Sequence, residues 1–306
     1  MSPRLTLPLP DDYRLQDVLA FHRRDTESVA EQVDEARLRK GILIDGVAVL
    51  LDVDLAHARR QPPGTARADC TVLADAALTA PQRLRAHEAL RNILGLRIDP
   101  QHFIDFARDD VLLGALVRAQ PGLRVVQSAT VFEALTWAVI GQQINLSFAI
   151  ALRRTFIQQA GRQHSSGLWC YPEAADVAAL NAEDLTSRKF SRAKAETLLL
   201  LARRVAEGAL ELKLSPGYGI EQVSAALLAL KGIGPWTVNY GLLRGYGYAD
   251  CSLHGDVAVR AALQPLLGEE SKPDMARTEQ ILARYAPHRT MAAAHLWASL
   301  HPRADD

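Results

Sequence analysis

The stretch that decides the fold runs from Leu227 to Leu263 and reads LLALKGIGPWTVNYGLLRGYGYADCSLHGDVAVRAAL. Two apolar segments of helical spacing flank a turn that contains Gly232 and Gly234, and Pro235 follows directly. Glycine permits tight turns and close approach of another backbone, and proline suits the first position of a helix. The pattern predicts two helices joined by a short hairpin at residues 224–244. The unpaired N–H groups at the start of the second helix can bind a phosphate.

Asp256 is the second feature of this stretch. It follows Gly255 and lies directly before an apolar segment of helical spacing. Taken alone, an aspartate in this place is typical of a helix N-cap. A carboxylate in such a setting can also stabilise a developing cation and orient a water molecule. Both readings stay open at the level of the single residue.

The charge of the chain permits a nucleic-acid partner without arguing for one. The formal net charge is zero. The first 110 residues contain 15 Lys and Arg against 18 Asp and Glu, and the remainder contains 20 against 17. The basic surplus therefore lies in the part that carries the hairpin. Its densest cluster, SRKFSRAK at residues 187–194, is typical of a solvated helix face.

The cysteines and the hydropathy pattern disfavour several protein classes. Cys70, Cys170 and Cys251 are far apart and form no Cys-x-x-Cys pair, which disfavours a disulfide framework, a zinc ribbon and a four-cysteine cluster. We expect three buried thiols. The chain has no apolar run of the ~20 residues that a membrane span needs, and no signal-peptide core at its start. A cytoplasmic protein is the simplest interpretation.

The patterning along the chain predicts a mainly α protein with an N-terminal α+β domain. The segment ILIDGVAVLLDVDL at residues 42–55 indicates strand, turn and strand, and RADCTVLADA at 67–76 indicates a further strand. Helical spacing covers residues 13–33. From Pro81 onward, helical patterns follow one another without a strand pattern of similar strength. We expect an antiparallel sheet within residues 1–110 and a helical region over 111–306.

The motif LKGIGPWTVNY followed by LHGD resembles the helix-hairpin-helix family of DNA base-excision glycosylases, in its 3-methyladenine DNA glycosylase II branch. The resemblance extends to DDYRLQDVLAFHRRDTESVAEQV, to QPGLRVVQSATVFEALTWAVIGQQIN and to HLWASLHP, and so covers nearly the whole chain. It implies the helix-hairpin-helix glycosylase fold, with two interleaved helical subdomains and a lesion cleft between them. It also implies a monomer that acts on double-stranded DNA containing alkylated bases.

The resemblance assigns roles to individual residues. Asp256 matches the catalytic carboxylate, which opposes the oxocarbenium character of a sugar that loses its base. Trp236, Tyr240, Trp297 and Phe21 match the walls of the base pocket. Alkylation at N3 or N7 makes a purine cationic, and electron-rich rings attract a cation by ~1–2 kcal/mol. The expected substrates are therefore purines of the 3-methyladenine and 7-methylguanine type.

The same resemblance predicts the DNA contacts. Gly232, Gly234 and Thr237 belong to the hairpin, and Lys231 is expected to lie near a phosphate. In IGQQIN, Gln142 and Gln143 are the candidates for the side chain that fills the gap left by a flipped nucleotide. Gln143 matches the wedge position, where the branch often has an apolar residue.

A departure from other branches predicts the reaction type. Branches that also cleave the strand carry a lysine at the start of the second hairpin helix, where this chain has Trp236. Without that amine no Schiff base forms, and we expect a monofunctional enzyme. We expect neither a metal site nor a redox cofactor, although the resemblance allows a monovalent cation at the hairpin. Two alternatives stay open: a non-catalytic helix-hairpin-helix DNA-binding protein, and a glycosylase for oxidised or deaminated bases.

Overall fold

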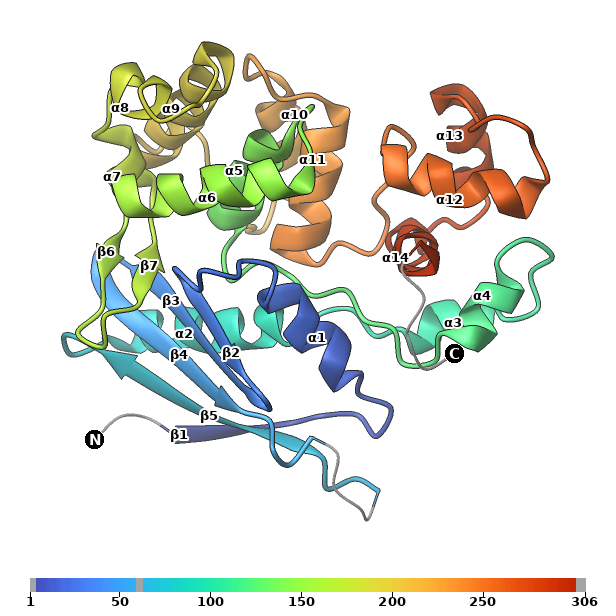
Figure 1. The fold of residues 1–306 in the computed structure, drawn as a ribbon, viewed down its shortest axis with the longest axis horizontal. Helices are drawn as coiled ribbons and strands as arrows, with labels where there is room; N and C mark the ends of the chain where they lie inside the picture. Colours follow the sequence, from blue (N-terminus) through green and yellow to red (C-terminus); the bar gives the residue numbers. More distant parts are fainter. Residues whose placement is uncertain (1–3, 59–62, 301–306) are drawn as a thin grey trace.

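The computed structural model describes residues 4–58 and 63–300, and in it the chain forms three parts (Figure 1). A sheet with two helices makes up the first part. A group of helices from the middle of the chain lies above the sheet in this view. A second helical group, which contains the C-terminal helices, lies beside both.

The sheet has seven strands, six of them in the order β1-β5-β4-β3-β7-β6. The seventh, β2, pairs with the first half of β3, and β7 pairs with Gly41 and Ile42 of the same strand. All neighbouring strands run antiparallel except β3 and β7. The strands are β1 (Arg4–Pro8), β2 (Glu31–Asp34), β3 (Arg37–Ile44), β4 (Val47–Asp54), β5 (Arg67–Ala74), β6 (Arg162–Gln163) and β7 (Trp169–Tyr171).

The strand, turn and strand predicted at residues 42–55 is confirmed by β3 and β4. Ile44 pairs with Val47, so that Asp45 and Gly46 form a two-residue turn. Their φ angles of +45° and +75° are those of the turn that fits the twist of a hairpin, which favours an Asp-Gly sequence. The predicted strand at 67–76 is likewise confirmed by β5.

The expectation of an antiparallel sheet confined to residues 1–110 was wrong. β6 and β7 come from the helical region, and β7 joins β3 in parallel through Gly41 and Cys170. A Cβ atom at Gly41 would lie 2.2 Å from the carbonyl oxygen of Trp169, so the absence of a side chain there permits the pairing. A three-residue strand shows too little alternation to be recognised from its own sequence.

Two helices, α1 (Leu15–His22) and α2 (Ala80–Ile93), belong to the sheet part. The helix expected over residues 13–33 is shorter than predicted, because α1 ends at His22. The Asp25 carboxylate then accepts the N–H groups of Glu27 and Val29, which turns the chain toward β2. By contrast, α2 is delimited at both ends by its local sequence, with a capping box at Thr79 and with Gly95 in the left-handed region just after it.

The helices from residue 101 onward form the two helical groups, which share one hydrophobic core separate from that of the sheet. The middle group contains α5 (Val131–Gly141), α6 (Leu146–Ala160), α7 (Ala174–Ala178), α8 (Ala182–Thr186), α9 (Arg192–Ala206), α10 (Ile220–Leu228), α11 (Pro235–Gly241) and η1 (Leu242–Tyr246). The C-terminal group contains α3 (Gln101–Ala107), α4 (Gly114–Ala119), α12 (Val257–Leu267), α13 (Met275–Ala283) and α14 (Arg289–Ser299).

The domain boundary expected at residue 110 needs a correction, because it separates α3 from the helices with which it packs. The Phe103 ring of α3 lies 5.4 Å from the His295 ring and 6.3 Å from the Tyr285 ring, between centroids. Asp110 also accepts a hydrogen bond of 2.8 Å from the Tyr285 hydroxyl. The chain therefore enters the C-terminal group at α3, crosses to the middle group, and returns at α12.

The cysteines are buried and unpaired, as predicted. Burial raises the pKa of the Cys251 thiol to about 12, which keeps it protonated. Across residues 4–58 and 63–300, no group of three or more histidine, cysteine, aspartate or glutamate side chains is arranged to hold a metal ion. No helix in that part of the chain has both the length and the apolar character that a membrane crossing requires.

Candidate active site and DNA interface

The predicted hairpin joins α10 to α11, and its two glycines have different tasks. Gly232 has a φ of +89°, and a Cβ atom there would lie 2.1 Å from the Thr197 hydroxyl oxygen. Gly234, the N-cap of α11, has an ordinary φ of −106°, and a Cβ atom there would meet nothing within 4 Å. Gly232 therefore makes the turn, whereas Gly234 leaves bare backbone beside open space. Lys231 is exposed on the same turn.

Asp256 is both a helix cap and the acceptor for two indole rings. Its Oδ1 accepts the backbone N–H groups of Ala258 and Val259, each at 3.0 Å, at the start of α12. The same oxygen accepts the Trp297 indole N–H at 3.1 Å, and Oδ2 accepts that of Trp236 at 2.9 Å. The side chain is partly exposed. Four N–H groups thus fix the carboxylate. Because Oδ2 accepts only one of them, it can accept a hydrogen bond from a further partner.

Three of the four predicted aromatic residues form one cluster around Asp256. The Trp236 and Tyr240 rings of α11 lie 5.2 Å apart, and Tyr240 lies 6.4 Å from Trp297 of α14, between centroids. Trp137 of α5 donates its indole N–H to the Tyr240 hydroxyl at 3.0 Å. Because α11 and α14 belong to different helical groups, the cluster lies where these groups meet.

Phe21 reaches this cluster through two arginines that the sequence analysis missed. The Arg24 guanidinium carbon lies 3.7 Å from the centroid of the Phe21 ring. That of Arg244 lies 4.9 Å from Phe21, 5.8 Å from Tyr240 and 5.4 Å from Trp297. Both arginines lie near residues that were singled out, Arg244 within the opening stretch and Arg24 three positions after Phe21. In a sequence, however, an isolated arginine looks like an exposed charge.

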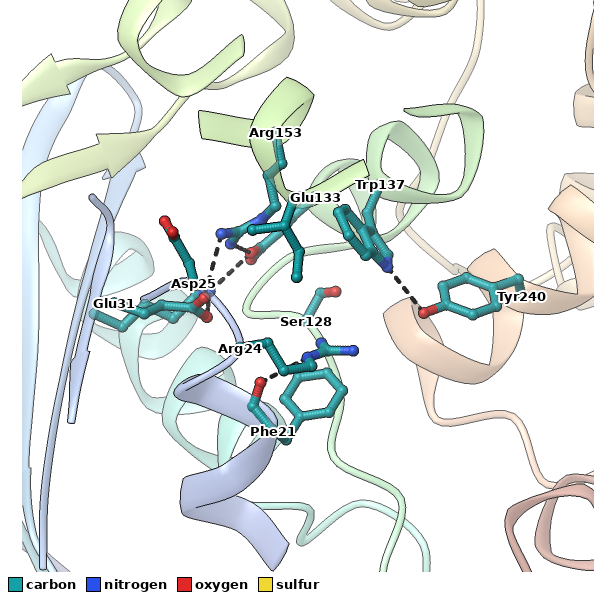
Figure 2. A pocket seen from close by; sticks show the side chains of 11 residues that line it. Phe21, Arg24, Asp25, Glu31, Ser128, Glu133, Trp137, Arg153 and Tyr240 are labelled. Carbon is teal, nitrogen blue, oxygen red and sulfur yellow. Dashed lines mark hydrogen bonds and ion pairs between the residues drawn. The ribbon is translucent and has the colours of Figure 1, made fainter. Parts of the chain in front are cut away.

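A small cavity, here called the inner cavity, adjoins the cluster (Figure 2). Phe21, Arg24, Trp137 and Tyr240 line one side, and charged side chains from the sheet part and from α5 and α6 line the other. Its volume of about 30 Å³ suits roughly one water molecule. Asp256 does not line it. A base could enter this space only if Arg24 or its neighbours moved.

A buried ionic network forms the far side of the inner cavity and joins the sheet to α5 and α6. Lys40 Nζ lies 2.5 Å from Glu31 and 2.7 Å from Glu133, and Arg153 lies 3.3 Å and 2.8 Å from the same two carboxylates. Burial by itself would raise the pKa of Glu31, but Lys40 and Arg153 outweigh it and hold the pKa well below its usual range. The pKa of Glu133 is lowered in the same way.

The wedge loop, residues 142–145, is tied to the hairpin by the residue beside the predicted wedge. Gln142 donates from Nε2 to the Gly232 carbonyl at 3.0 Å and to the Thr237 hydroxyl at 2.9 Å. Lys194 donates from Nζ to the Gln142 carbonyl at 2.5 Å. Gln143 is exposed, with a φ of +56°. Gln143 is thus exposed to solvent, whereas the buried Thr237 hydroxyl accepts a hydrogen bond from Gln142 of this loop.

Comparisons with known proteins agree with this geometry. The family model described as HhH-GPD superfamily base excision DNA repair protein matches residues 136–288. The putative DNA-3-methyladenine glycosylase YfjP of Bacillus subtilis is 31% identical over 201 residues, which cover 65% of this chain and 69% of that protein. DNA-3-methyladenine glycosylase 2 of Escherichia coli is 29% identical over 187 residues, which cover 60% and 63% of the two chains.

Solved structures share the fold over nearly the whole chain. A 3-methyladenine DNA glycosylase from Archaeoglobus fulgidus superposes with a TM-score of 0.76 at 21% identity, covering 96% of this chain and 97% of that one. A Clostridium acetobutylicum 8-oxoguanine glycosylase/lyase in complex with double-stranded DNA gives 0.69 at 14% identity, covering 97% and 96%. The chain therefore belongs to the HhH-GPD superfamily of base excision DNA repair proteins, as its motifs indicated.

Proposed function

We propose that this protein is a monofunctional DNA glycosylase that removes alkylated purines of the 3-methyladenine and 7-methylguanine type during base excision repair. The observation that carries the proposal is the Asp256 carboxylate, held by the indole N–H groups of Trp236 and Trp297 beside Tyr240. The names of the Bacillus and Escherichia relatives support the alkylated substrate. The substrate nucleotide leaves the duplex, because C1′ is out of reach within the base stack.

In this mechanism Asp256 opposes the positive charge that develops on the sugar as the base departs. Oδ2 has a free lone pair for the sugar or for the attacking water, while Oδ1 is committed to the start of α12 and to Trp297. A fixed carboxylate needs no reorganisation during the reaction, and fixed charges of this kind are often the largest single contribution to catalysis. Trp236 and Trp297 therefore position the carboxylate as well as lining the base site.

The reaction proposed is hydrolysis without strand cleavage. Trp236 occupies the position of the lysine in branches that cut the strand, and its indole N–H is used by Asp256. Lys231 lies on the turn before α11, and Lys194 donates to carbonyl groups of the wedge loop. No amine is thus assigned to a Schiff base with the sugar. The products are a free base and an abasic site in an intact backbone.

Backbone groups supply much of the DNA contact in this proposal. Gly234 offers bare backbone to a phosphate, Lys231 approaches a neighbouring phosphate, and Gln143 fills the gap left by the flipped nucleotide. Release needs neither a metal ion nor a redox cofactor. A monovalent cation at the hairpin would have to share the Gly232 carbonyl with Gln142, and we assign it no step. The protein acts as a monomer in the cytoplasm, where bacterial DNA lies.

The test is a single-turnover assay on duplex DNA that carries one 7-methylguanine. Chromatography identifies the released base, and a denaturing gel before and after alkali reports the backbone. We expect free 7-methylguanine, a strand that breaks only after alkali, and the same rate with and without EDTA. A protein that binds the duplex and releases no base would be a binding protein instead. Strand breaks before alkali would contradict the monofunctional assignment.

A further inference from the structure

His22 is buried at a point where two helix ends and the sheet meet. It is the last residue of α1, and its Nε2 lies 2.8 Å from the carbonyl oxygen of Ile93, the last residue of α2. Its Nδ1 lies 3.0 Å from Oε1 of Glu31 in β2. Only 1% of His22 is exposed. The imidazole ring therefore joins α1 to α2 and to the sheet.

Both partners of this ring can only accept hydrogen bonds. The Ile93 carbonyl has no proton to donate. Burial alone would raise the pKa of Glu31, but Lys40 and Arg153 outweigh it and hold the pKa well below its usual range, so the group is an ionised carboxylate. No hydrogen-bond donor among the described residues lies at either ring nitrogen. Because a neutral imidazole donates from one nitrogen only, it would leave its other lone pair against an oxygen.

His164 shows the contrasting arrangement. It is also buried, in the turn between β6 and β7. Its Nδ1 accepts the N–H group of Ser166 at 3.1 Å, and its Nε2 lies 3.3 Å from Oδ1 of Asp75. A neutral ring satisfies both contacts, because one nitrogen accepts and the other donates. The ring of His22 satisfies both of its contacts only when each nitrogen carries a proton.

The surroundings of His22 can stabilise such a positive charge. The buried network contains two carboxylates, Glu31 and Glu133, and two cations, Lys40 and Arg153, which balance one another. A charged His22 is therefore an excess, and the C-terminal ends of α1 and α2 oppose it. Unpaired carbonyl groups make the C-terminal end of a helix partly negative, which favours a cation there.

We propose that His22 is a buried imidazolium that positions Phe21 in the aromatic cluster, by fixing the end of α1 to Glu31 and to the end of α2. Phe21 precedes it in the chain, and the two rings lie 5.2 Å apart, edge to face. Phe21 lines the inner cavity, whereas His22 does not. His22 is thus a positioning residue that acts through Phe21. The inference rests on the proposed glycosylase activity.

The charge of the ring is tested by NMR on the whole, ¹⁵N-labelled wild-type protein at neutral pH. A long-range ¹H–¹⁵N spectrum distinguishes an imidazolium, in which both nitrogens carry a proton, from a neutral ring, in which one nitrogen is bare. Through-bond assignment identifies each ring without any substitution. We expect two protonated nitrogens for His22 and one for His164. A bare nitrogen in His22 would overturn the buried cation.

The positioning role is tested by a double-mutant cycle on the release of 7-methylguanine. His22→Gln keeps a donor for the Ile93 carbonyl, His22→Asn keeps one for Glu31, and neither side chain carries a charge. Each should slow single-turnover release by on the order of fivefold. In a Phe21→Ala background the same substitutions should slow it no further, because the residue through which His22 acts is missing. An equal loss in both backgrounds would overturn the positioning role.

The matched control is His164→Gln, which removes another buried histidine from the sheet and should leave release unchanged. Melting temperatures show which variants are folded, and the spectrum of the wild type needs no variant. Full release by a folded His22→Gln variant overturns the positioning role and leaves the glycosylase assignment intact. A wild type that releases no base refutes the proposed function and the positioning role together.

Discussion

Replacing Asp256 by asparagine separates its two tasks, because asparagine caps a helix about as well as aspartate. The amide oxygen can take the place of Oδ1 and accept the N–H groups of Ala258, Val259 and Trp297. The amide nitrogen then takes the place of Oδ2 and faces the indole N–H of Trp236, so that two donors meet where a 2.9 Å hydrogen bond was. The variant keeps the cap, loses the charge and leaves one indole donor without an acceptor.

The expected effects differ widely in size. A unit charge about 4 Å from a sugar cation contributes ~4 kcal/mol at an effective dielectric constant of 20, so base release should fall by on the order of 10³-fold. The lost hydrogen bond to Trp236 should lower the free energy of unfolding by only about 1 kcal/mol. Affinity for lesion DNA should hold or rise, because a negative charge near the phosphates is removed.

The assay measures single-turnover release, binding and melting temperature on one preparation. Asp274→Asn is the matched control, since Asp274 is the exposed N-cap of α13 and should affect neither release nor binding. Trp236→Phe, which removes the same indole donor but keeps the carboxylate, should retain much more activity than Asp256→Asn. If Asp256→Asn releases bases at nearly the wild-type rate, the carboxylate is only a cap and the proposed mechanism fails.

Other parts of the structure make further predictions. Lys194→Met removes the ammonium group that donates to the Gln142 carbonyl of the wedge loop. Binding of lesion DNA, measured by fluorescence anisotropy, should weaken roughly fivefold while the melting temperature stays unchanged. Unchanged binding would show that the loop needs no support. Gly232→Ala should destabilise the fold by about 1–3 kcal/mol, whereas Gly234→Ala should keep the melting temperature and weaken binding to all DNA sequences alike. The folded protein lowers the pKa of Glu133, so the ionised carboxylate stabilises the folded state. This stabilisation is present above the unfolded pKa of ~4.3 and is lost as the pH falls through the folded pKa. Unfolding of Glu133→Gln should therefore depend less on pH below about 4 than that of the wild type, and equal slopes would argue against the network.

The sequence predicted those parts of the fold and site that depend on local patterns. The hairpin glycines and Pro235 define a turn, and Asp45 with Gly46 defines another, because few residues tolerate these backbone conformations. Trp236 and Tyr240 share one face of α11 by helical spacing. The gathering of Asp256 with Trp297 follows from the family motif, since nothing local relates residues that are 41 positions apart.

Features that depend on contacts between distant segments could not be predicted. The pairing of β7 with β3 depends on the space above Gly41, which the sequence of neither strand reveals. The placement of α3 depends on the contact of Phe103 with the His295 ring, nearly 200 residues later in the chain. The ring contacts of Arg24 and Arg244 could not be predicted for the same reason, because an arginine is recognised as part of an aromatic cluster only when the neighbouring rings are known.

In the proposed mechanism, the carboxylate and one wall of the base pocket come from different parts of the chain. Asp256 and its donor Trp236 lie within residues 136–288, the segment that defines the superfamily. Phe21 and Arg24 lie outside that segment, at the end of α1, and the part of the chain that carries them is fastened to α5 and α6 by the buried network around Lys40. Substitutions at Phe21 therefore change that wall and leave the carboxylate and its indole donors untouched. The network fastens the sheet part to α5 and α6 through Glu31, Lys40, Glu133 and Arg153, none of which contacts Asp256 among the described residues.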